Sequence, residues 1–206
     1  MIILWNNSID NLKQTKLNNL IKKITEYISV SEQDIDLTGK LFIRKEFHKN
    51  DCIHTAGSIC KDFFYIEKGI VTHYTSSDDK ETVIYFSSEN EFVCDFDSFI
   101  SKKPSKKSFI AIEDTVIYSI SYDNLQQFYT KVKEGERFGR LYLESVFAET
   151  INHLISVFTE SAEKRYLDFL KKFKHIQQRV PQYYIASFIG VTPQSLSRIR
   201  RQIAKK

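Results

Sequence analysis

Glycine, proline and cysteine are scarce in this 206-residue chain, which contains six, three and three of them. So few glycines and prolines leave no stretch that resembles a flexible linker or a low-complexity tail. The cysteines (Cys52, Cys60 and Cys94) are odd in number and widely spaced, which argues against a disulfide framework and a zinc ribbon. We therefore expect reduced thiols, a cytoplasmic location and no structural metal.

Long apolar runs are also missing. No stretch approaches the roughly 18 apolar residues of a membrane span. The start, MIILWNNSIDN, lacks the basic segment and the apolar length of a secretory signal. The length suits one large or two small domains with a buried core, and no membrane partner is indicated.

Acidic residues are absent from residue 171 to residue 206, where nine residues are Lys or Arg. The net charge of the chain is +4, so residues 1–170 carry −5 and the C-terminus forms a basic tip. Such a tip is an electrostatic footprint for a phosphate backbone. An anionic membrane surface would need a broad free apolar face, whereas the apolar positions here suit helix packing, so nucleic acid is favoured.

The segment 182–201 (QYYIASFIGVTPQSLSRIRR) is typical of a DNA-binding helix-turn-helix. Ala186 is fifth of the twenty, where two helices cross, and Gly190 is ninth, where the turn needs a positive φ. Thr192 and Pro193 then supply an N-cap oxygen and a first-turn proline. The positions facing the small core are apolar: Ile185, Ile189, Val191, Leu196 and Ile199. A surface helix pair with no nucleic-acid role is the alternative.

The outward positions of the second helix are all polar: Gln194, Ser195, Ser197, Arg198, Arg200 and Arg201. Gln194 and Arg198 lie one turn apart and are the best base readers, since Gln pairs with adenine and Arg with guanine. Hydroxyls of Thr192, Ser195 and Ser197 lie where phosphates approach. Arg200, Arg201 and Arg179 are expected to contact the backbone and set the register.

The rest of the chain predicts an α+β protein. Residues 9–29 have the period of an amphipathic helix, and residues 41–121 alternate short Phe-, Tyr-, Ile- and Val-rich runs with turn clusters, as in an antiparallel barrel or sandwich. Gly57 and Gly69 are expected at strand corners, and residues 76–80 at a hairpin tip. A short helix is expected over residues 123–128, and residues 163–173 begin the DNA-binding part.

Residues 134–158 predict one long helix. Phe147, Ile151, Leu154 and Phe158 follow the 4-3-4 spacing of a two-helix contact, flanked by Leu143, Val146 and Ile155. The helix can pack on its own barrel alone, but we favour one face on the barrel and another on a second subunit. The expected divisions are an effector domain (1–132), a dimerisation helix (133–160) and a helix-turn-helix domain (161–206).

The stretch FHKNDCIHTAGSICKDFFYIEKGIVTHY and the motif IASFIGVTPQSLSRIRR resemble the Crp/Fnr (cyclic-AMP receptor protein) family of bacterial transcription regulators. The resemblance implies a cyclic-nucleotide-binding-like jelly-roll barrel (a double-stranded β-helix), a dimerisation helix and a helix-turn-helix. It also implies a homodimer that binds specific double-stranded DNA and has RNA polymerase as a further partner. By this resemblance Gln194 and Arg198 occupy base-reading positions, and Pro193 occupies a third.

Two departures from the family are visible. Where its nucleotide cassette has Gly-Glu and Arg-Ser pairs, this chain has Cys94-Asp95 and Ser105-Lys106. Lysine does not replace a bidentate arginine, so we expect no cyclic AMP. Another effector, or none, would use a pocket at Cys94, Asp95, Phe96, Ser105 and Lys106, with Lys103 or Lys107 as further cations. The second departure is the end at Lys206, which leaves no full two-stranded wing.

Other functions fit less well. Residues 1–51 contain no cysteine, which argues against the iron–sulfur cofactor of the oxygen-sensing branch of the family, and no histidine has a signal for haem. A cupin-type enzyme needs a His-x-His pair, which is absent, as are a P-loop, G-x-S-x-G and G-x-G-x-x-G. We expect neither a cofactor nor catalysis. A regulator that acts on a protein partner without touching DNA remains the alternative.

Overall fold

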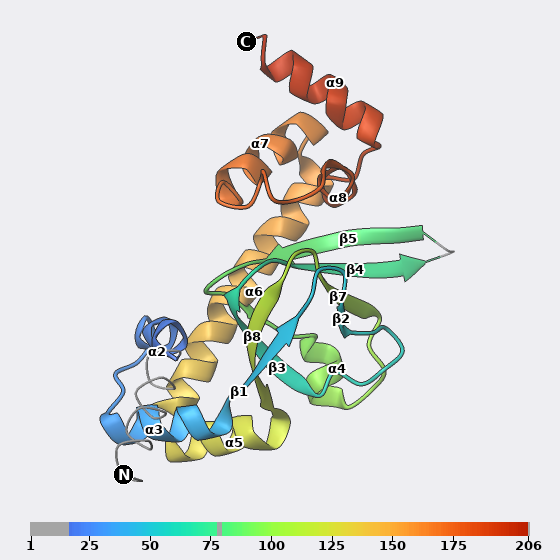
Figure 1. The fold of residues 1–206 in the computed structure, drawn as a ribbon. Coiled ribbons are helices and arrows are strands. Elements are labelled where there is room, and N and C mark those ends of the chain that lie inside the picture. Colours follow the sequence, from blue (N-terminus) through green and yellow to red (C-terminus); the bar gives the residue numbers. More distant parts are fainter. Residues whose placement is uncertain (1–16, 78–79, 206) are drawn as a thin grey trace, which may run out of the picture.

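The chain runs from short helices through a β barrel to a group of helices at the C-terminal end (Figure 1). The computed structural model describes residues 17–77 and 80–205. The first helices of the described residues are α2 (Asn18–Thr25) and α3 (Glu32–Leu41). The strands are β1 (Ile43–Phe47), β2 (Cys52–His54), β3 (Asp62–Lys68), β4 (Val71–Ser77), β5 (Lys80–Ser87), β6 (Phe92–Val93), β7 (Lys107–Ala111) and β8 (Thr115–Ser121), with α4 (Phe96–Ser101) between β6 and β7.

The strands form two antiparallel sheets, with the orders β1-β8-β3-β6 and β2-β7-β4-β5. Tyr65 of β3 lies opposite Tyr118 of β8, and His73 of β4 opposite Phe109 of β7. Many side chains of these strands are buried, among them Tyr65, Ile66, Phe109 and Ile117. This arrangement confirms the α+β class and the antiparallel barrel predicted from the alternating runs.

The two predicted glycine corners are present. Gly57 has φ 85° and Gly69 has φ 101°, both in the left-handed region that side chains avoid. At Gly69 a Cβ atom would lie 2.4 Å from Oγ1 and 2.8 Å from Cα of Thr115, so the close approach of the chain also requires glycine.

The helices after the barrel are α5 (Tyr122–Lys131), α6 (Gly135–Thr159), α7 (Ala162–Lys172), α8 (Gln182–Phe188) and α9 (Pro193–Ile203). The helix α6 lies along the barrel and leads to α7, while α9 lies at the end of the molecule opposite α3 and α5 (Figure 1). Phe138 and Tyr142 of α6 pack on Phe92, with ring centroids 5.8 and 5.2 Å apart. The predicted long helix is therefore present, with one face on the barrel.

The C-terminal helices share an apolar cluster with the barrel. Phe86 of β5 contacts Phe169 and Phe173 of the α7 region and Phe188 of α8, with centroids 5.4–6.1 Å apart. The helix pair is thus packed against β5. Within the described part of the chain, no helix combines the length and the apolar character needed to span a bilayer.

The helix α3 was not anticipated, and one segment predicted as a strand is mostly helical. Ser31 caps α3 through a capping box with Asp34, a signal present in the sequence. The apolar run 92–100 gives only the two-residue strand β6 before α4 begins. Asp95 directly precedes α4, and its buried carboxylate is held by Ser105 and Lys107. Of the helix expected over residues 9–29, α2 accounts for Asn18–Thr25, and its expected beginning lies outside the described residues.

Candidate nucleic-acid interface and barrel cavity

Helices α8 and α9 form a tight pair. Gly190 has φ 75° in the turn between them, and the Thr192 hydroxyl accepts a hydrogen bond from the Ser195 backbone N–H at 3.2 Å. Pro193 occupies the first turn of α9. Ala186 and Leu196 are buried where the helices cross. The turn chemistry expected from the sequence therefore holds the pair in place.

The outer side of α9 is open to solvent and polar. Its exposed residues are Thr192, Pro193, Gln194, Ser197, Arg198, Arg200 and Arg201, and Ser195 is half-buried. The Thr192 hydroxyl, which caps the helix, donates to the Ser195 hydroxyl at 3.0 Å. The Arg200 guanidinium donates to the side-chain carbonyl of Gln182 on α8. Apart from Arg179, the residues predicted to meet DNA thus lie at the start and along the solvent side of α9. Three of them already have partners: the Thr192 and Ser195 hydroxyls bind each other, and Arg200 binds Gln182.

Arg179 has different partners from those expected. Its guanidinium lies 2.6 Å from the Glu89 carboxylate and also contacts Glu113, and both acids belong to barrel loops. Burial acts to raise the pKa of Glu89, but hydrogen bonds from Arg179 and Gly69 N–H outweigh it and leave that pKa lowered. The loop between α7 and α8 runs past these acids, so in this conformation Arg179 binds the barrel.

Further polar contacts join the C-terminal helices to the rest of the chain. His175 Nε2 lies 2.8 Å from the Ser88 hydroxyl, and the Val83 N–H donates to the Ser187 hydroxyl at 2.9 Å. The Lys172 ammonium pairs with Glu149 of α6. Together with Arg179 these contacts hold the C-terminal helices on the barrel and on α6, and no local sequence signal predicts them.

A cavity of about 500 Å³ lies between the barrel and α6. Among its lining residues are Lys23, Tyr27, His73, Tyr85, Glu91, Cys94, Phe96, Lys107, Tyr142 and His153. Burial raises the pKa of Glu91 to about 7, partly offset by a hydrogen bond from the Ser88 N–H. The cavity therefore combines aromatic walls with a carboxyl group that titrates near neutral pH.

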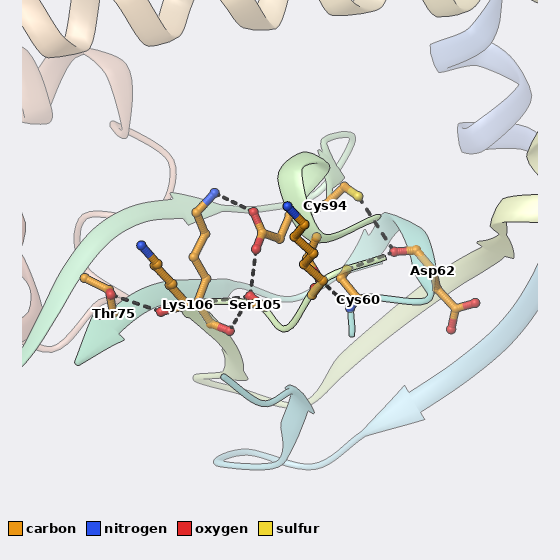
Figure 2. Close-up of polar contacts among 10 residues, drawn as sticks. Cys60, Asp62, Thr75, Cys94, Ser105 and Lys106 are labelled. Carbon is orange, nitrogen blue, oxygen red and sulfur yellow. Dashed lines mark hydrogen bonds and ion pairs between the residues drawn. The ribbon is translucent and has the colours of Figure 1, made fainter. Parts of the chain in front are cut away.

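The predicted effector residues divide into three groups. Cys94 and Phe96 line the cavity, whereas Lys106 is exposed, with its carbonyl accepting from the Thr75 hydroxyl. Asp95 and Ser105 are buried, and the Ser105 hydroxyl donates to Asp95 Oδ2 at 2.7 Å (Figure 2). The sequence alone did not place these residues on different sides of the barrel wall.

Lys107, and not Lys106, is the lysine that pairs with Asp95. Its Nζ lies 2.7 Å from Asp95 Oδ1. Burial acts to raise the pKa of Asp95, but the hydrogen bonds from Lys107 and Ser105 outweigh it and lower that pKa. The different orientations of Lys106 and Lys107 could have been inferred from the sequence, because neighbouring residues of a strand point to opposite faces.

Residues 44–132 match the family of the cyclic nucleotide-binding domain. Solved structures extend the likeness along the chain. FixK2 from Bradyrhizobium japonicum is 15% identical with a TM-score of 0.67, covering 80% of this chain and 85% of its own. A protein from Eubacterium rectale described as a transcriptional regulator of the Crp/Fnr family is 15% identical with a TM-score of 0.66, covering 85% of this chain and 84% of its own. The chain has the Crp/Fnr fold.

A third structure of the Crp/Fnr fold is the c-di-GMP responsive global regulator CLP of Xanthomonas campestris. It is 16% identical, has a TM-score of 0.66, and the match covers 85% of this chain and 92% of CLP. No curated protein sequence matches the chain. The resemblance drawn from the glycine corners and the C-terminal motif is thus confirmed for the fold.

Proposed function

We propose that this protein is a homodimeric, sequence-specific DNA-binding transcription regulator of the Crp/Fnr type that does not depend on cyclic AMP. The observation that carries the proposal is α9 itself: Gln194, Arg198 and Arg201 are all exposed on a helix whose apolar side is buried against α8. A helix of this kind on a basic tip suits the major groove, where Gln and Arg read base edges and further arginines bind phosphates.

The homodimer rests on the second half of α6. Its apolar residues are exposed, namely Leu143, Phe147, Ile151, Leu154, Ile155, Val157 and Phe158. Phe147 is 68% and Phe158 79% exposed, unusual values for phenylalanine. An apolar stripe on a helix favours a matching helix as its cover. A second copy of α6 would set two α9 helices for successive major grooves, roughly 34 Å apart.

Independence from cyclic AMP rests on the pair Asp95–Lys107. A nucleotide phosphate needs an available cation, preferably a bidentate arginine. Here Lys107 is bound to Asp95 at 2.7 Å, so the local charges neutralise each other without a ligand. Opening this pair for a phosphate would leave the buried Asp95 carboxylate without a cation and with only the Ser105 hydroxyl as a partner, which is costly.

Three measurements test the proposal. Selection of DNA from a random pool, followed by gel shifts at low salt, should return a near-palindromic site with two half-sites about one helical turn apart. Light scattering should give the mass of a dimer, and added cyclic AMP should leave the affinity for DNA unchanged. If the protein retarded no DNA at low ionic strength, the proposal of a DNA-binding regulator would be overturned. The alternative, a regulator that acts on a protein partner, would then remain.

A further inference from the structure

Cys60 and Cys94 are brought together by neighbouring strands. Cys60 lies two residues before β3 and Cys94 directly follows β6, and these strands pair antiparallel with Phe64 opposite Val93. Both thiols point to one backbone atom: the Asp62 carbonyl oxygen lies 3.4 Å from Cys60 Sγ and 3.9 Å from Cys94 Sγ (Figure 2). The two sulfur atoms therefore share one small region of the barrel wall.

The two thiols differ in pKa and in exposure. A hydrogen bond from the Cys94 thiol lowers the pKa of Cys60, whereas burial raises the pKa of Cys94. Cys60 is fully buried, while Cys94 lines the cavity beside α6. A small molecule in the cavity thus reaches Cys94, with Cys60 directly behind it.

We propose that Cys60 and Cys94 form a reversible dithiol–disulfide site, oxidised by a small hydroperoxide that enters the cavity. One sulfur attacks a peroxide oxygen, the O–O bond breaks, and a sulfenic acid and an alcohol (water, for hydrogen peroxide) are formed. The other sulfur then attacks the sulfenic sulfur, and its proton leaves with the displaced hydroxide as water. Two thiols and one hydroperoxide give one disulfide, one alcohol and one water, and a reducing dithiol reverses the change.

The site has two properties that suit this chemistry. Because both sulfurs already lie within 3.9 Å of the same Asp62 carbonyl oxygen, closing the bond needs a local movement of two side chains. The disulfide would also link the segment before β3 to the segment before α4. These segments are already in contact, because the Cys60 N–H donates to the Ser98 hydroxyl of α4 at 2.9 Å. Oxidation would therefore change the structure of the cavity wall, which Cys94 lines.

Cys52 offers a control within the chain. It is exposed and is engaged with the His54 carbonyl and the Thr55 hydroxyl, apart from the pair. The full-length Cys52→Ser variant is treated with hydrogen peroxide, denatured, alkylated with N-ethylmaleimide and weighed by mass spectrometry. We expect loss of two hydrogen atoms, no maleimide uptake, and a tryptic cross-link between the peptides that contain Cys60 and Cys94. Dithiothreitol should restore uptake of two maleimides.

Uptake of two maleimides after oxidation would overturn the proposal, as would a cross-link between two Cys94 side chains of different molecules. The cross-link is mapped in a protein that keeps both thiols, so the test does not depend on a variant that lacks one of them. DNA is not needed for this test, so its result is independent of the proposed regulator.

Discussion

Arg179 Nη2 lies 2.6 Å from Glu89 Oε1, and this contact fastens the loop before α8 to the barrel. Glu113 binds the same guanidinium from a second barrel loop. The side chains of all three residues are partly buried, with 26–35% exposed. The helix α8 also packs on β5 through Phe188 and Ser187, so the ion pair adds to contacts that hold the helix pair on the barrel.

Arg179→Ala should loosen the helix pair from the barrel. Ion pairs at partly exposed sites are screened by water, so we expect a loss of about 1 kcal/mol, which is about a fivefold change in a local opening equilibrium. Hydrogen exchange followed by mass spectrometry should show faster exchange in β5 and α8. Arg140→Ala removes an exposed ion pair with Glu144 within α6 and serves as the control. Equal exchange in the two variants would contradict the role of Arg179.

His73 predicts a dependence of stability on pH. Burial lowers its pKa to about 3, aided by the charge of Lys107 and opposed by Asp95. The unfolded chain protonates this histidine below its ordinary value of 6.5, while the folded chain keeps it neutral down to about 3. The unfolded state then binds more protons, so stability falls as the pH drops through this window, by about 1.4 kcal/mol per pH unit.

His73→Gln should remove this contribution. Urea unfolding at a series of pH values should give a smaller loss of unfolding free energy below pH 6.5 in the variant than in the wild type. His48→Gln is the control, because the His48 side chain is 92% exposed. Parallel curves for wild type and His73→Gln would refute the assignment.

Gly57 and Gly69 form a matched pair for substitution by alanine. Both have a positive φ, but nothing lies within 4 Å of a Cβ at Gly57, whereas Thr115 backbone would lie 2.8 Å from a Cβ at Gly69. Gly57→Ala should cost about 1 kcal/mol for the backbone alone. Gly69→Ala adds overpacking and should cost about 2–4 kcal/mol in urea unfolding. Equal costs would mean that the chain relaxes around Thr115.

Much of the fold could be predicted, because its signals are local. The period of residues 134–158, the N-cap at Thr192 and the glycines at strand corners depend on nearby residues, and each appears where the sequence placed it. The polar side of α9 follows from the same helical period.

What could not be predicted depends on pairing over distance. The partners Glu89 and Glu113 are far from Arg179 in sequence, and only the packed chain brings them together. The run that contains Cys94 and Asp95 had the composition of a strand, but Asp95 is buried in contact with Lys107 and Ser105, and the chain is helical from Phe96 onward. Local propensity cannot register either effect, since tertiary contacts override it.

The exposed stripe of α6 gives a prediction on assembly. Phe147→Asp or Phe158→Asp would place a charge in an apolar helix contact, which is strongly unfavourable without a partner. We expect the mass by light scattering to fall from dimer to monomer at micromolar concentration. Ile100→Asp is a fair control, because Ile100 on α4 is 61% exposed and lies away from the stripe. A variant of Phe147 that remains dimeric would count against this interface.

Arg198 and Arg201 should differ in their effects on DNA binding. Both are exposed on α9, but Arg198 lies one turn after Gln194 and has the place of a base reader, whereas Arg201 lies nearer the end of the helix, as a backbone contact would. Arg198→Ala should lose about 1–3 kcal/mol on the selected site and relax the preference at one base pair.

Arg201→Ala should instead weaken binding to all sequences alike, and should reduce the slope of log K against log salt by about 1. Titrations of the selected site and of a scrambled duplex at several salt concentrations separate the two effects. Arg140→Ala, an arginine of α6 already paired with Glu144, should bind both duplexes as the wild type does. If Arg198→Ala and Arg201→Ala lost affinity equally on both duplexes, both residues would be phosphate contacts, and base reading would have to come from Gln194.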